Sequence, residues 1–134
     1  MSSEKLVNNH AAVTAKPPAT VWILTLLMIP MSFMCVVGSF LFAFPMGGLL
    51  GYTLGTLLIV AGILYVTVAW RLRRGERTVW TVALVLPIVH TLSLNTLDLV
   101  MNGAIPSDDY PFMGVALVIV ILLLLPVTRR YFTK

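Results

Sequence analysis

The sequence predicts an all-α membrane protein, folded as an antiparallel four-helix transmembrane bundle with both termini in the cytoplasm. Three observations predict this class: the composition, the length of four apolar runs, and the placement of the basic residues. Of 134 residues, 59% are hydrophobic and only 10% are charged, whereas soluble domains have about 45–50% and about 25%. With a mean hydropathy of +0.98, a water-soluble fold would expose large apolar patches, so lipid is the expected solvent.

Residues 1–20 are expected to form a polar cytoplasmic tail ahead of the first apolar run. We expect no cleaved signal peptide, because no small-residue cleavage site follows that run at the required distance. Lipid anchors are not expected either. Ser2 stands where N-myristoylation needs glycine, and Thr133 and Lys134 end the chain in place of a prenylation motif.

A transmembrane helix needs about 20 residues, because it rises about 1.5 Å per residue across about 30 Å of hydrocarbon. Polar residues separate four such runs, and we expect helices at residues 21–44, 47–70, 78–100 and 112–127. Pro17 and Pro18 precede the first helix, and Arg129 and Arg130 close the fourth. Short connections predict that neighbouring helices run antiparallel, so residues 21–134 are expected to form one transmembrane domain.

All nine basic residues fall on one side of the predicted membrane. They are Lys5, Lys16, Arg71, Arg73, Arg74, Arg77, Arg129, Arg130 and Lys134. The two opposite connections have no Lys or Arg, and the second carries Asp108 and Asp109. By the positive-inside rule both termini are cytoplasmic, and we expect a multi-pass protein of the plasma (inner) membrane. The net charge of +4 comes from these flanking residues, so no nucleic-acid partner is expected.

No motif in the sequence predicts catalysis, a cofactor or a metal, and enzymatic activity is not expected. Cys35 is the only cysteine, which excludes an intramolecular disulfide and argues against a zinc site. Met28, Met31 and Met34 lie near Cys35 at helical spacing, and soft sulfur ligands can hold Cu(I). Because no histidine or second cysteine is expected to join them, we interpret these methionines as apolar filling.

Small residues at helical spacing predict close helix packing in the first two helices. In the second helix they are Gly48, Gly51, Gly55 and Gly62, and in the first they are Ser32, Cys35 and Ser39. Such a row of small residues along one helix face, which we call a seam, lets two backbones approach closely in lipid. The expected contact is between helices of one chain, and the alternative is a homo-oligomer or partner interface.

Pro30, Pro87 and Pro126 each free a backbone carbonyl, so kinks are expected at three helices.

The third helix carries the candidate proton or ligand site. Thr91, Asn95, Asp98 and Asn102 fall within about 60° of one another around the helix axis, while His90 lies near the bilayer midplane. A histidine there can stay neutral in lipid and take a proton when water reaches it. The alternative is a structural histidine bonded to Ser32, Ser39, Thr56 or a freed carbonyl, with Asp98 capping the helix or meeting interfacial water. Haem ligation would need a second buried imidazole, and His10 lies in the polar tail.

The segment LLLLPVTRRYF, residues 122–132, together with four spans and a basic central connection, resembles small uncharacterised four-helix membrane proteins of actinobacterial type. The resemblance covers about a tenth of the chain and implies a bacterial plasma membrane without supplying a catalytic residue. Small multidrug resistance transporters share the size and the number of spans. Their essential acidic residue lies in the first span, whereas the first span here has no acid, which argues against membership.

We therefore expect a small non-enzymatic accessory or interaction subunit of a larger plasma-membrane complex. Its expected partners are membrane lipids and other membrane protein subunits or further copies of the chain. The alternative is a proton-linked small transporter or ligand-binding membrane protein that uses the polar face of the third helix. A lipid-processing enzyme using the same residues is the third hypothesis.

Overall fold

The computed structural model describes residues 16–133, and these are helical nearly throughout. The long helices are α2 (Ala19–Met46), α3 (Gly48–Arg71), α4 (Arg77–Asn102) and α5 (Tyr110–Leu124), and a short α6 (Pro126–Phe132) follows. Single turns of 3-10 helix, η1 (Leu72–Arg74) and η2 (Ser107–Asp109), lie in the connections. Four helical stretches are long and apolar enough to cross a bilayer, which confirms the four predicted spans and indicates a multi-pass membrane protein.

Helices α2 and α3 form a close pair, and glycine makes it possible. A tight turn joins them at Gly47 and Gly48, whose φ angles of 57° and 61° lie in the left-handed region that favours glycine. Along the interface, a Cβ at Gly51 would lie 2.9 Å from the Phe42 carbonyl oxygen, and one at Gly55 would lie 3.0 Å from that of Ser39. Any larger residue would therefore force the two backbones apart.

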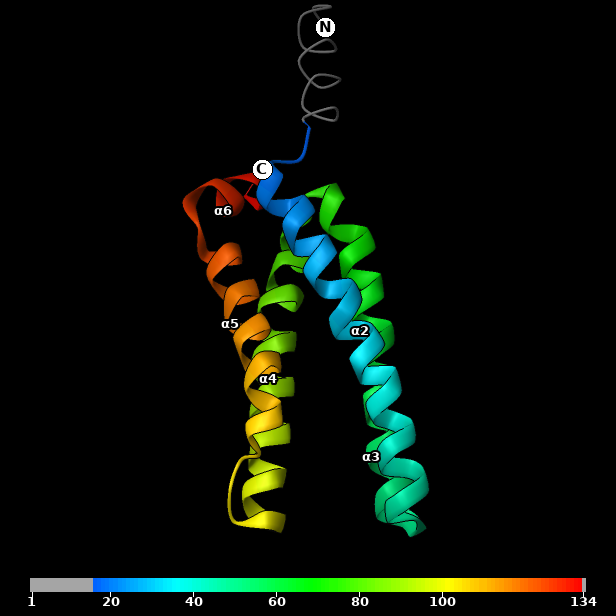
Figure 1. Cartoon of the computed structure of the whole chain (residues 1–134). Helices are drawn as coiled ribbons and strands as arrows, with labels where there is room; N and C mark the ends of the chain where they lie inside the picture. Colours follow the sequence, from blue (N-terminus) through cyan, green and yellow to red (C-terminus); the bar gives the residue numbers. More distant parts are fainter. Residues whose placement is uncertain (1–15, 134) are drawn as a thin grey trace, which may run out of the picture.

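The four long helices are arranged as two pairs, α2 with α3 and α4 with α5, that meet at one end and diverge toward the other (Figure 1). We call the end that carries η1, α6 and the start of α2 the closed end. The opposite end, with the turn at Gly47 and the 103–106 connection, is the open end. The N-terminal side of α2 and the C-terminal side of α6 both lie at the closed end (Figure 1).

The apolar core lies in the half of the molecule nearer the closed end. It is made of Val21, Leu24, Met28, Met31, Cys35, Tyr65, Val68, Ala69, Leu72, Val79, Ala83, Ala116, Ile119, Leu123 and Phe132. In α4, His90 is the last buried residue, and none of residues 91–102 is fully buried. Packing between the two pairs therefore ends at the level of His90.

Side chains at the closed end fasten the pairs together. Within the first pair, the Arg73 guanidinium of η1 lies 4.1 Å from the centre of the Trp22 ring of α2, in the geometry of a cation–π contact, and two hydrogen bonds then reach the other pair. The Tyr131 hydroxyl donates to the Arg73 carbonyl oxygen, and Thr128 donates to the Thr20 hydroxyl at 2.8 Å. Helix α6 is thereby tied to both α2 and η1.

The fourth span ends earlier than expected, at Leu124 instead of residue 127. Leu125 has an extended backbone, with a ψ of 138°, and Pro126 has no N–H to donate to the Leu122 carbonyl. Pro126 therefore begins α6 instead of kinking one continuous helix. Helices α2 and α4, in contrast, continue through Pro30 and Pro87.

Candidate functional site

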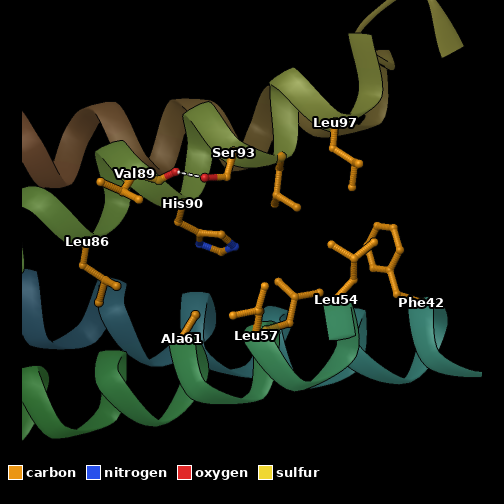
Figure 2. Close-up of a pocket in the computed structure, with 11 residues that line it drawn as sticks. Phe42, Leu54, Leu57, Ala61, Leu86, Val89, His90, Ser93 and Leu97 are labelled. Atoms are coloured by element: carbon orange, nitrogen blue, oxygen red, sulfur yellow. Dashed lines mark hydrogen bonds between the residues drawn. The ribbon is translucent and has the colours of Figure 1, made fainter. Parts of the chain in front are cut away.

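Two cavities lie between the helical pairs. The larger, of about 320 Å³, is lined by α3 and α4 and by Phe42 of α2, and it is almost entirely apolar (Figure 2). The smaller, of about 160 Å³, is lined by α2, α4, α5 and η2 and by Leu58 of α3. Phe42, Leu58, His90 and Leu94 line both cavities. The two cavities therefore adjoin one another, and His90 lies where the pairs begin to separate.

The His90 ring is held by one side chain from each of the other three long helices. The Tyr65 hydroxyl of α3 lies 3.2 Å from Nδ1, close enough to donate to it when the ring proton is on Nε2. The Cys35 thiol of α2 lies 3.8 Å from both ring nitrogens, and the Phe112 ring of α5 meets the imidazole edge-to-face at 5.1 Å. The imidazole is thus fixed in place while one side of it borders the larger cavity (Figure 2).

The polar face predicted on the third helix divides among three environments. Thr91 and Asn95 line the smaller cavity. Asp98 lies nearer the open end, where its carboxyl group comes within hydrogen-bonding reach of Asp109 in η2. Asn102 is exposed at the last position of α4. The structure therefore brings Thr91 and Asn95 together with His90 and leaves Asn102 apart.

The expected hydrogen-bond partners of His90 are engaged elsewhere. Ser32 donates to the Gly62 carbonyl oxygen at 2.8 Å, and Ser39 and Thr56 donate within their own helices. The argument that no histidine approaches Cys35 is wrong, because helix packing brings His90 to the thiol. Within residues 16–133, however, no three His, Cys, Asp or Glu side chains converge to hold a metal ion.

Sequence reasoning missed three residues of the site: Tyr65, Phe112 and Asp109. Tyr65 follows Gly62 by three residues and so continues the small-residue seam into the core, a signal that marks it as buried. Phe112 and Asp109 gave no such signal, because each was interpreted from its position at the membrane boundary. Their approach to α4 depends on how α5 packs, which the spacing of residues does not reveal.

The predicted packing residues lie mainly between α2 and α3. Gly51, Gly55 and Gly62 all face α2 closely, whereas a Cβ at Gly48 would meet nothing within 4 Å.

Between α4 and α5, Trp80 donates from Nε1 to the Leu123 carbonyl oxygen at 3.0 Å. This bond satisfies one of the carbonyl groups left free where α5 ends before Pro126.

One buried polar atom at this level has no hydrogen-bond partner among the described residues. It is the Thr91 hydroxyl oxygen, and Thr91 lines the smaller cavity. A buried hydroxyl without a partner costs about 1–3 kcal/mol, and a polar group brought next to this oxygen would reduce that cost. The site therefore offers apolar walls, an imidazole and a hydroxyl.

Comparisons of the chain with protein-family models, with curated proteins and with solved structures found no match. The function is therefore inferred from the geometry of the cavities and the residues that line them.

Proposed function

We propose that this protein is a non-enzymatic plasma-membrane protein that binds a small ligand, with an apolar body and a polar group, between its two helical pairs. The observation that carries the proposal is the position of His90, which borders both cavities at the point where the pairs separate. A binding role fits this arrangement better than catalysis, because the imidazole contacts a phenol, a thiol and a phenyl ring.

The polar group of the ligand is needed for selectivity. A purely apolar molecule gains little by moving from lipid into an apolar cavity, because lipid tails are as apolar as Leu side chains. His90 and the unpartnered Thr91 hydroxyl supply hydrogen-bonding groups at membrane depth, where water does not compete for them. We therefore expect the ligand to be held by shape along the cavity walls and by hydrogen bonds at its inner end.

We further propose an antiparallel bundle in which the closed end faces the cytoplasm. Every Lys and Arg among the described residues flanks the closed ends of the helices, which supports this orientation by the positive-inside rule. The cavities then open toward the outer leaflet, and both termini are cytoplasmic.

The test uses para-tert-butylphenol, a neutral probe with a compact apolar body and one hydroxyl. The full chain is placed in phosphatidylcholine nanodiscs, and probe binding is followed through the His90 ring signal in NMR spectra of histidine-labelled protein. Only His10 and His90 contribute such signals, so His90→Gln assigns them. We expect a saturable shift of the His90 signal, and a shift that is absent or grows linearly with the probe content of the membrane would overturn the proposal.

Two tryptophan variants on α3 provide a matched comparison. Leu57 lines the larger cavity, whereas Ile63 borders no cavity described above, and both side chains are 60% exposed. Because the larger indole would occupy part of the larger cavity, Leu57→Trp should weaken probe binding about tenfold or more. Ile63→Trp should leave binding unchanged, and equal losses in both variants would count against the site.

A second candidate is the accessory or interaction subunit, and one observation favours it. A groove of about 410 Å³ lies between α4 and α5, shares Thr91 and Met113 with the smaller cavity, and is lined by Gly114. A Cβ at Gly114 would meet nothing within 4 Å, so a neighbouring helix could approach closely there. Gly114→Leu should then abolish co-purification of a partner in fixed ratio from mild detergent, whereas Leu57→Trp should not. Unchanged recovery of the partner with Gly114→Leu would exclude this groove.

A further inference from the structure

The smaller cavity combines apolar walls with negative charge. Asp108 and Asp109 of η2 line it, together with the aromatic rings of Phe42 and Phe112 and the thioether of Met34. Asp98 comes close to Asp109 from α4, so a third carboxyl group lies near the cavity mouth. The carboxyl groups therefore lie beside a space that the chain does not fill.

Among residues 16–133, no basic side chain lies at the open end to balance these carboxyl groups. The sequence has no Lys or Arg between residues 17 and 70 or between residues 78 and 128, so no basic side chain comes from the open half of any long helix. The one ion pair among the described residues joins Arg71 and Glu76 at the closed end. Unpaired negative charge at a membrane cavity attracts a cation, because charges near a low-dielectric wall are weakly screened.

From this charge pattern, and relying on the ligand-binding role proposed above, we infer that the ligand is an amphipathic organic cation, of the alkyl- or arylammonium class. Its positive group lies by Asp108 and Asp109 and its apolar body extends toward His90. Phe42 and Phe112 add ring faces or edges near the positive group, and aromatic faces attract ammonium groups.

A metal ion fits this site less well than an organic cation. Within the described part of the chain no three acidic, histidine or cysteine side chains converge on one point, so a small ion would lack ligands. The rest of the cavity lining is apolar or aromatic, which suits carbon groups. Thr91, whose hydroxyl is buried and has no partner in residues 16–133, also forms part of the wall of this cavity.

The experiment compares two probes that differ by one atom. In para-hydroxyphenyltrimethylammonium, a positive nitrogen replaces the central carbon of the tert-butyl group of para-tert-butylphenol, and the shape is otherwise the same. Both are titrated into the full chain in phosphatidylcholine nanodiscs, and affinity is measured from the His90 ring signal. Each probe is compared only with itself across protein variants, which removes the difference in membrane partitioning.

The variant Asp108→Asn/Asp109→Asn should weaken binding of the cationic probe about tenfold or more, because it replaces both carboxyl groups next to the ammonium group by uncharged amides. Binding of the neutral probe by the same variant should change less than about twofold, which also reports that the variant is folded. Glu76→Gln removes one carboxylate at the closed end and should change neither affinity.

Two results would overturn the inference. One is an unchanged affinity of the double variant for the cation, and the other is binding of the neutral probe without binding of the cation by the unaltered chain. If neither probe shifts the His90 signal, the ligand-binding function itself fails. The outcomes thus distinguish a failure of the inference about the charge of the ligand from a failure of the proposed binding function.

Discussion

His90 illustrates what a single polar residue can organise inside a membrane protein. A buried polar group needs hydrogen-bond partners in lipid, because water is not there to supply them. Cys35, Tyr65 and Phe112 come from the three other long helices and all contact this ring. Side chains of all four long helices therefore meet at the level of the imidazole.

The hydroxyl of Tyr65 is predicted to set the tautomer of His90. Tyr65→Phe keeps the ring that packs in the core but removes the group 3.2 Å from Nδ1. We expect a loss of about 1–2 kcal/mol in stability, because one buried nitrogen loses its partner. Ring nitrogen NMR shifts should also move away from the form protonated on Nε2. Tyr52→Phe, at an exposed tyrosine of the same helix, is the control, and unaltered His90 shifts in Tyr65→Phe would refute the assignment.

Tyr131 supplies a second residue-scale prediction, at the closed end and outside the spans. Burial raises the pKa of Tyr131 above its ordinary value of 10.0, and the neutral phenol donates to the Arg73 carbonyl oxygen. A raised pKa in the folded protein means that the stabilisation is complete below about pH 10 and is lost as the pH rises further. The free energy of unfolding should therefore fall above pH 10, and fall less steeply in Tyr131→Phe. Parallel pH profiles for the two proteins would disprove this role.

At the scale of elements, the α2–α3 pair depends on backbone proximity more than on large side chains. Gly51 and Gly55 lie against carbonyl oxygens of α2 that cannot move without moving the helix. In lipid, where no hydrophobic force pushes apolar helices together, such close contact is the main source of association. The interface is therefore expected to tolerate changes on the lipid-facing sides of both helices far better than on this seam.

Alanine substitutions test the seam with an internal control. Gly51→Ala and Gly55→Ala should each destabilise the protein by about 1–3 kcal/mol, because the added methyl group overpacks the interface. Gly114→Ala, where a Cβ meets nothing within 4 Å, should instead be neutral or stabilising by up to about 1 kcal/mol through helix propensity. Reversible unfolding in mixed micelles measures all three, and equal effects at the three positions would contradict the close contact.

The sequence predicted the elements well and the neighbours of each element poorly, for a physical reason. Hydropathy located four spans because crossing a bilayer needs a minimum apolar length. It could not assign the faces of α5, because a side chain such as Ile119 in the core and one such as Ile121 on the surface are equally apolar when lipid is the solvent. The depth of His90 was predictable from its place in the span, whereas its contact with the Phe112 ring depends on how α5 packs against α4.

For the whole molecule, the orientation in the membrane gives the most direct prediction. In a Cys35→Ser background, a cysteine placed at Ser107 should react with a membrane-impermeant maleimide added to intact cells. A cysteine placed at Arg130 should react only after the cells are opened, because the positive-inside rule puts the closed end in the cytoplasm. Labelling of Arg130→Cys from outside would reverse the proposed topology.

The two helical pairs are connected at the closed end and are separate at the open end. The Tyr131–Arg73 and Thr128–Thr20 hydrogen bonds connect the pairs at the closed end, whereas beyond His90 the chain of α4 and α5 has no fully buried residue up to Val115. Small changes in the lateral pressure of the bilayer at the open end should therefore change the angle between the two pairs. In the orientation proposed above, we therefore expect the thickness and crowding of the outer leaflet to change the separation of the two pairs at the open end.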